Sequence, residues 1–171
     1  LMGQEIMVQT LKNAFKTNRI AHAYMLTGVR GVGKTTTARL LARSLNYETD
    51  IINEPNIDML ELGKHCLEIM ESRHIDVIEM DAASRTGIAD IREIIDSVNY
   101  SPASARYKIY IIDEVHMLSK AAFNGLLKTL EEPPAHVKFI FATTEVQKIP
   151  LTILSRCQRF DLKRFDNDMI K

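Results

Sequence analysis

The stretch that decides the fold is HAYMLTGVRGVGKTTTARLLARSL, residues 22–45. It opens with a short apolar run that ends at Gly28, which is typical of a buried strand. From Lys34 onward the apolar residues recur at helical spacing, so a helix is expected to begin there. The turn between the two is rich in glycine. The segment therefore predicts a strand, a glycine-rich turn and a helix in immediate succession.

Residues 28–35 consist of a glycine, four residues and then Gly-Lys-Thr, which is the P-loop pattern. Its glycines let the backbone N–H groups point inward, and the helix N-terminus adds positive potential. Lys34 can then reach the β and γ phosphates of a nucleotide, and the Thr35 hydroxyl can bind Mg²⁺. The alternative is a glycine-rich turn with a chance Lys-Thr pair, but the flanking strand and helix favour a nucleotide site. The predicted nucleotide-binding residues are Gly28, Val29, Arg30, Gly31, Val32, Gly33, Lys34, Thr35 and Thr36.

The rest of the chain continues to alternate strands with helices. Such alternation indicates βαβ units and a parallel sheet, and hence the α/β class. The stretch from Asn46 to Gly63 has no sustained period and is predicted to be a loop or small appendage. Further strands are predicted at 75–81, 108–114 and 137–144, and further helices near 7–15, 64–72, 88–98 and 119–132.

Two predicted strands end in polar residues that suit nucleotide chemistry. The strand 108–114 ends with Asp113 and Glu114. Carboxylates at the carboxyl end of a parallel strand lie where open α/β sheets bind ligands. Asp113 would hold Mg²⁺ through water, and Glu114 would orient and polarise the attacking water. Thr144, or with less support Thr143, could hydrogen-bond the γ-phosphate or that water. Alone, these residues would read as ordinary polar strand ends.

The composition is that of an ordinary globular domain. The 171 residues carry 22 Lys and Arg against 22 Asp and Glu, so the net charge gives no sign of nucleic-acid binding. No apolar run approaches the roughly 20 residues of a membrane span. The first residues lack the pattern of a signal peptide, and Cys66 and Cys157 do not suggest a disulfide framework. A cytoplasmic protein without membrane contact is expected.

One further stretch, IPLTILSRCQRF at 149–160, places Arg156 after an apolar run. Taken alone, it could be a strand edge with a solvated arginine. Four segments together give it another meaning, since they resemble the gamma/tau family of bacterial DNA polymerase III, the ATPases of the sliding-clamp loader. These segments are HAYMLTGVRGVGKTTTARLLARSLN, RHIDVIEMDAASRTGIADIREI, YIIDEVHMLSKAAFNGLLKTLEEPP and FATTEVQKIPLTILSRCQRFDL.

The resemblance implies an AAA+ fold with a five-stranded parallel sheet in the order 5-1-4-3-2. It also implies that Arg156 acts in trans, as an arginine finger toward the ATP held by a neighbouring subunit. The implied partners are the delta and delta-prime subunits, further gamma/tau copies, the sliding clamp and primed DNA. Arg85 and Lys128 are candidate DNA-facing cations, although solvated surface charge explains them equally well.

The chain departs from the family in two respects. Family members usually carry a four-cysteine zinc module, whose positions correspond here to Tyr47, Leu60, Gly63 and Cys66. One ligand of four cannot hold a structural zinc, so residues 47–66 are expected to form a degenerate, zinc-free appendage. The segment that completes the adenine pocket, the helical lid and the C-terminal collar domain are not expected within these 171 residues, which are expected to form the nucleotide-binding core alone.

The expected function is that of an ATP-hydrolysing motor subunit of the clamp loader, with ATP and Mg²⁺ and no zinc. No polymerase active site is evident in the chain, although the protein would belong to the polymerase holoenzyme. One alternative is another AAA+ motor that remodels DNA, such as a branch-migration motor. Another is a scaffold subunit that no longer hydrolyses ATP, against which the intact Lys34, Thr35, Asp113 and Glu114 argue.

Overall fold

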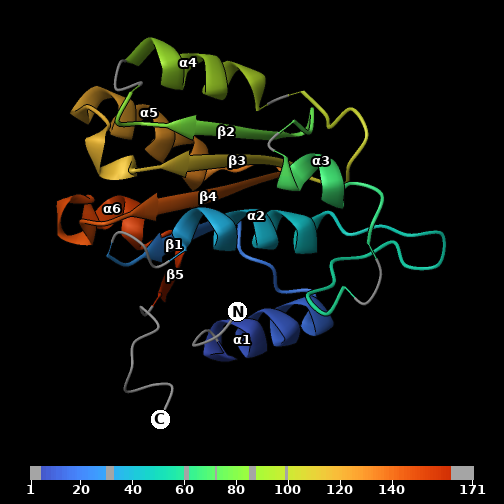
Figure 1. The fold of residues 1–171 in the computed structure, drawn as a ribbon. Coiled ribbons are helices and arrows are strands. Elements are labelled where there is room, and N and C mark those ends of the chain that lie inside the picture. Colours follow the sequence, from blue (N-terminus) through green and yellow to red (C-terminus); the bar gives the residue numbers. More distant parts are fainter. Residues whose placement is uncertain are drawn as a thin grey trace.

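In the computed structural model, five parallel strands form one sheet in the order β2-β3-β4-β1-β5 (Figure 1). This confirms the α/β class and the strand order that the resemblance implies. The structure describes residues 5–29, 33–59, 62–71, 73–84, 88–98 and 100–162. The strands are β1 Ala23–Thr27, β2 Val77–Asp81, β3 Lys108–Asp113, β4 Val137–Thr143 and β5 Gln158–Asp161.

The central strands are apolar because helices cover both of their faces. Every residue of β1 and β4 is buried, as is the interior of β3. Thr27 is paired with Thr143, and Asp81 with Asp113, so the carboxyl ends of four strands meet at one edge of the sheet. This edge is where a doubly covered parallel sheet binds its ligands.

Two helical layers enclose the sheet, with α2 and α5 on opposite faces (Figure 1). One core cluster joins the sheet to α1, α2 and α3, and the other joins it to α4, α5 and α6. The Ser119 side chain accepts a hydrogen bond from the N–H of Ala122, which confirms the predicted start of α5. The helices are α1 Glu5–Thr17, α2 Lys34–Leu45, α3 Cys66–Met70, α4 Ile88–Ser97, α5 Lys120–Glu131 and α6 Leu151–Leu154.

The stretch 149–160 is not one strand edge, so that interpretation is wrong for its first half. It contains the short helix α6, a turn that includes Arg156, and only then the edge strand β5. Ile149 and Ile153 are four residues apart and both enter the core beneath α5, whereas Leu151 is exposed. Helical rather than alternating burial accounts for the apolar residues of this run.

The appendage after α2 has no helix or strand between Tyr47 and His65 in its described residues. Hydrogen bonds from side chains to backbone groups connect it to the segment that leads into β3. The Asn46 side chain bonds both the N–H and the carbonyl of Tyr107. The guanidinium of Arg106 donates to the carbonyls of Leu45 and Tyr47 and to the Asn53 side chain.

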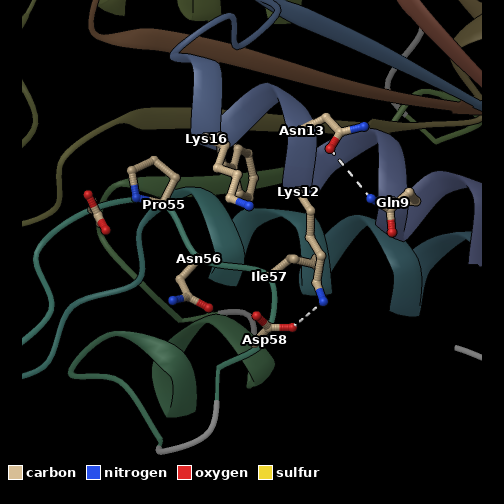
Figure 2. Close-up of a pocket in the computed structure, with 10 residues that line it drawn as sticks. Gln9, Lys12, Asn13, Lys16, Pro55, Asn56, Ile57 and Asp58 are labelled. Atoms are coloured by element: carbon tan, nitrogen blue, oxygen red, sulfur yellow. Dashed lines mark hydrogen bonds and ion pairs between the residues drawn. The ribbon is translucent and has the colours of Figure 1, made fainter.

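A polar pocket of about 430 Å³ lies between α1 and residues 54–58 of the appendage (Figure 2). An ion pair of 2.8 Å between Lys12 Nζ and Asp58 Oδ1 crosses it. Phe15 and Ile57 supply the apolar part of its wall. None of the residues predicted to bind nucleotide lines this pocket, so it is separate from the P-loop and the end of β3.

Candidate nucleotide site

The P-loop leads directly from β1 into α2, as predicted. Gly33 precedes α2 with φ +86°, a backbone conformation that favours glycine. Val29 is exposed, and Thr36 lies exposed in the first turn of α2. The predicted loop residues Arg30, Gly31 and Val32 lie outside the described residues. The described ends of the loop have the strand-to-helix geometry that phosphate binding requires.

Lys34 begins α2 and is only 7% exposed. Its Nζ donates to the carbonyls of Gly28 at 3.0 Å and Val29 at 3.1 Å. In the described part of the chain no carboxylate lies within ion-pair distance of this ammonium group. A buried cation with carbonyl partners alone is well suited to meet an anion such as a phosphate.

The next residue, Thr35, faces the acidic end of β3. Its hydroxyl lies 3.4 Å from Asp113 Oδ2, while Asp113 Oδ1 accepts the backbone N–H of Glu114 at 2.9 Å. Both residues also line a cavity of about 330 Å³ that extends beneath the carboxyl end of β2. A hydroxyl and a carboxylate at this spacing are oxygen ligands of the kind that Mg²⁺ prefers, so the donor set fits this cation.

Glu114 has a left-handed backbone conformation, with φ 51° and ψ 45°. Such a conformation is uncommon for a residue other than glycine and is often found at functional sites. It directs the chain toward the end of β4, where the Thr144 hydroxyl donates to Glu114 Oε2 at 3.2 Å. Thr143 is instead fully buried, with its hydroxyl 2.8 Å from Nδ1 of His116. Of the two threonines, only Thr144 therefore contacts Glu114.

Two members of this cluster were missed by sequence reasoning, His116 and Glu145. His116 Nε2 lies 3.5 Å from Glu114 Oε2 and 3.2 Å from Glu145 Oε2. Their positions in the sequence could have indicated them, because His116 lies two residues after Glu114 and Glu145 lies one residue after Thr144. Their meeting depends on the sharp turn at Glu114, which no glycine or proline announces.

Arg156 is not brought to this cluster by any contact that the structure describes. It is exposed in the turn after α6, where Nη1 donates to the carbonyl of Thr152 at 3.0 Å. Its Nη2 lies 3.7 Å from Glu131 Oε1 at the end of α5. Of the two candidate DNA-facing cations, Lys128 is exposed on α5 and Arg85 lies outside the described residues.

The positions that correspond to a zinc module are filled by close packing. Tyr47 and Cys66 are both 1% exposed, Gly63 is buried, and Leu60 lies outside the described residues. His65 Nδ1 and His74 Nε2 are 2.7 Å apart, and His65 Nε2 lies 3.3 Å from Glu48. Among the residues that the structure describes, no group of three potential metal ligands is assembled.

A five-stranded parallel sheet in this order, with a P-loop pattern after β1 and an acidic end on β3, is the fold of AAA+ P-loop proteins. Residues 3–166 match the family model described as DNA polymerase III, delta subunit. The chain therefore belongs to this family.

Curated relatives place the chain near the tau and gamma subunits of that polymerase. It is 53% identical over 171 residues to DNA polymerase III subunit tau of Escherichia coli, covering 100% of this chain and 26% of the relative. It is 51% identical over 170 residues to the tau subunit of Bacillus subtilis, covering 99% of this chain and 30% of that protein. The chain thus spans well under half of the length of each of these two relatives.

Solved structures show the same fold at much lower sequence identity. A gamma subunit-related protein from Thermotoga maritima has a TM-score of 0.63 at 23% identity, with 94% of this chain and 47% of that chain covered. The RuvB Holliday junction branch migration motor of the same organism has a TM-score of 0.62 at 19% identity, with coverage of 98% and 48%. In the described part of this chain, no helix is long and apolar enough to cross a membrane.

Proposed function

We propose that this chain is the ATP-binding and ATP-hydrolysing core of a clamp-loader motor subunit in bacterial DNA polymerase III. The observation that carries the proposal is the buried ammonium group of Lys34 beside the Thr35–Asp113 pair. A point charge for phosphates and oxygen ligands for Mg²⁺ are thereby adjacent on the same edge of the sheet. The identity of about half of the residues to tau subunits supports the clamp-loader assignment.

In this proposal Lys34 holds the β and γ phosphates together with the backbone N–H groups of residues 28–36. Thr35 and Asp113 would hold Mg²⁺, which neutralises charge on the phosphates when bound. Glu114 orients and polarises the attacking water, and Thr144 keeps the Glu114 carboxylate in place. Asp113 and Glu114 are neighbours at the end of β3. In this proposal the first carboxylate holds Mg²⁺ and the second acts on water.

Arg156 serves the site of a neighbouring subunit. Two observations support this role: its side chain is exposed, and its described contacts are to Thr152 and Glu131 instead of to its own P-loop. A guanidinium in such a position can reach a second chain and offset charge that develops on the γ-phosphate there. The proposed assembly includes delta, delta-prime and further gamma/tau copies, which together act on the sliding clamp and primed DNA.

A branch-migration motor shares this fold, but its likeness here is at 19% identity and concerns the fold alone. The experiment that tests the proposal is ATP turnover by the full-length protein assembled with its partner subunits. Turnover that rises when purified clamp and primed DNA are both added supports a clamp-loader motor. Turnover stimulated by branched DNA but not by the clamp would support the branch-migration alternative, and absence of turnover would support a scaffold.

A further inference from the structure

His116 lies beside the proposed hydrolytic residues but has no role in the proposed ATP hydrolysis. It lies in the 3₁₀ helix η1, Val115–Met117, directly after Glu114. Its side chain is only 4% exposed, yet it meets three polar side chains, those of Glu114, Thr143 and Glu145. This imidazole contacts the carboxylate that is proposed to activate water. What it does there depends on which of its ring nitrogens carries a proton.

The contacts determine which ring nitrogen carries a proton. Nε2 faces two carboxylates, Oε2 of Glu145 at 3.2 Å and Oε2 of Glu114 at 3.5 Å. A lone pair on Nε2 would repel both, so this nitrogen carries hydrogen. Nδ1 lies 2.8 Å from the Thr143 hydroxyl, which can donate to it or accept from it. Thr143 Oγ1 also accepts the backbone N–H of Glu145, which fixes the hydroxyl in place.

The Glu114 carboxylate is therefore approached by two hydrogen donors on the same oxygen. Thr144 donates to Oε2 from one strand end, and the Nε2–H of His116 faces Oε2 from η1. Within the described residues no donor contacts Oε1. This arrangement immobilises one oxygen and leaves the other to meet water. We propose that His116 is a positioning residue for Glu114, an inference that rests on the proposed role of Glu114 in ATP hydrolysis.

Glu145 competes with Glu114 as the acceptor for the proton on His116 Nε2. It lies nearer to Nε2 than Glu114 does, and it also pairs with Lys148 at 3.2 Å. Lys148 belongs to the 3₁₀ helix η2, Val146–Lys148, which leads into α6 and the turn with Arg156. If Glu145 moves toward Lys148, the Nε2–H of His116 faces Glu114 without a competing acceptor. His116 thus links the water-activating side chain to the segment that carries Arg156.

Two substitutions separate this role from a purely structural one. In His116→Gln the amide nitrogen lies near the place of Nε2, whereas in His116→Asn it lies near the place of Nδ1. We expect His116→Asn to lower kcat for ATP about tenfold or more, because the N–H that faces Glu114 Oε2 at 3.5 Å is lost. KM should change less than about twofold, since phosphate binding is untouched. His116→Gln should retain most of the activity.

The measurement is steady-state ATP hydrolysis by the full-length protein in its assembly, with His136→Asn as the matched control. The reverse order, with Asn active and Gln inactive, would assign His116 to packing against Thr143 and overturn the inference. Equal kcat in both variants and wild type would overturn it as well. If wild-type protein hydrolyses no ATP, the proposed function itself fails, and that outcome is seen before any variant is compared.

Two more tests complete the set, and the first of them, Glu145→Gln, needs no His116 variant and so applies even if both His116 variants unfold. Glu145→Gln weakens the competing acceptor and is expected to raise kcat, because the Nε2–H then remains with Glu114. A lower kcat would contradict the competition. In a Glu114→Gln background, His116→Asn should cause no additional loss, since His116 acts through Glu114. An additional tenfold loss in that background would show an independent role and overturn the inference.

Discussion

At the scale of single residues, the ammonium group of Lys34 is the feature on which the proposed nucleotide binding most directly depends. It is almost completely buried, and its described partners are two carbonyls without a compensating carboxylate. Lys34→Ala should therefore abolish ATP binding, because it removes the charge that meets the β and γ phosphates. Isothermal titration of the full-length protein with ATP and Mg²⁺ provides the measurement.

The control for that experiment is Lys12→Ala, which removes a half-exposed lysine of α1 that pairs with Asp58. This variant should bind ATP as the wild type does. Unchanged affinity in Lys34→Ala would contradict the assignment of residues 28–36 as the phosphate site.

The placement of part of this site can be predicted from the sequence for a physical reason. A P-loop pattern requires a defined turn, and the carboxyl ends of parallel strands meet at one edge, so Thr35 and Asp113, both assigned to Mg²⁺ from the sequence, lie close together. The contact of His116 with Glu114 could not be predicted in this way. It depends on a left-handed residue at Glu114, and that conformation is not signalled by a glycine.

At the scale of elements, the burial of a strand or helix explains whether it can be predicted from the sequence. β1, β3 and β4 are covered on both faces, so their residues are apolar almost throughout and easily recognised. β5 is a four-residue edge strand with one buried residue, and its pattern is too short to identify. The four-residue α6 precedes it, with apolar residues on both its buried and its exposed side. Short elements of this kind are decided by tertiary contacts.

The appendage at 47–66 is predicted to hold no zinc. Only Cys66 of the four corresponding positions is a metal ligand by type, and Tyr47 and Gly63 cannot serve as thiolates. Elemental analysis of full-length protein purified without chelators should find well under one zinc per chain. Stoichiometric zinc that persists in Cys66→Ser would show that other residues supply the ligands.

Packing should replace the metal in organising this segment. A Cβ at Gly63 would lie 3.0 Å from the Glu48 carbonyl and 3.0 Å from the Tyr47 ring. Gly63→Ala is therefore expected to lower the free energy of unfolding by about 1 to 3 kcal/mol, a usual cost of overpacking. Urea denaturation measures this change. Stability equal to the wild type would mean that the appendage can shift to accommodate the added Cβ without a measurable loss of stability.

At the scale of the whole molecule, Lys138 makes the stability of the fold depend on pH. It lies in the central strand β4, only 3% exposed, with Nζ 4.9 Å from the centre of the Tyr107 ring. Within the described residues it has no carboxylate partner. Burial lowers the pKa of Lys138 to about 8. The unfolded chain, with an ordinary lysine pKa of about 10.4, holds this proton more tightly.

The sign of the effect follows from where the proton resides. Between pH 8 and about 10.4 the unfolded chain binds more protons at this position, so Lys138 makes stability rise with pH. Below pH 8 both states are protonated, and the folded state retains a buried charge at full cost. Lys138→Met should thus raise the free energy of unfolding at pH 7 by about 1 to 3 kcal/mol. This gain should shrink toward pH 10.

Urea denaturation at pH 7 and pH 10 provides the measurement, with Lys128→Met on the exposed side of α5 as the control. A gain for Lys138→Met that is the same at both pH values would contradict a buried, titrating lysine. A loss of stability at pH 7 would mean that the ammonium group is stabilised by the Tyr107 ring to a greater extent than burial destabilises it.

Arg156 connects the scale of the chain to that of the assembly. Because its described contacts are to Thr152 and Glu131, Arg156→Ala should leave ATP binding by its own subunit nearly unchanged. Hydrolysis in the assembled protein should fall by about 10³ to 10⁵, as for other arginine fingers. The exposed Arg159, which pairs with Asp161 on β5, offers the control, and Arg159→Ala should retain activity.

Assemblies that mix wild-type and Arg156→Ala subunits decide where the lost activity resides. A second substitution, Lys34→Ala, silences the nucleotide site of one chosen subunit, so that hydrolysis at the other sites can be assigned. If Arg156 acts in trans, the site that faces the variant arginine loses activity, while the site within the variant subunit keeps it. Loss confined to the variant subunit's own site would show that Arg156 acts on its own nucleotide. Loss at both sites, with lowered thermal stability, would make it a structural arginine that holds α6 to Glu131.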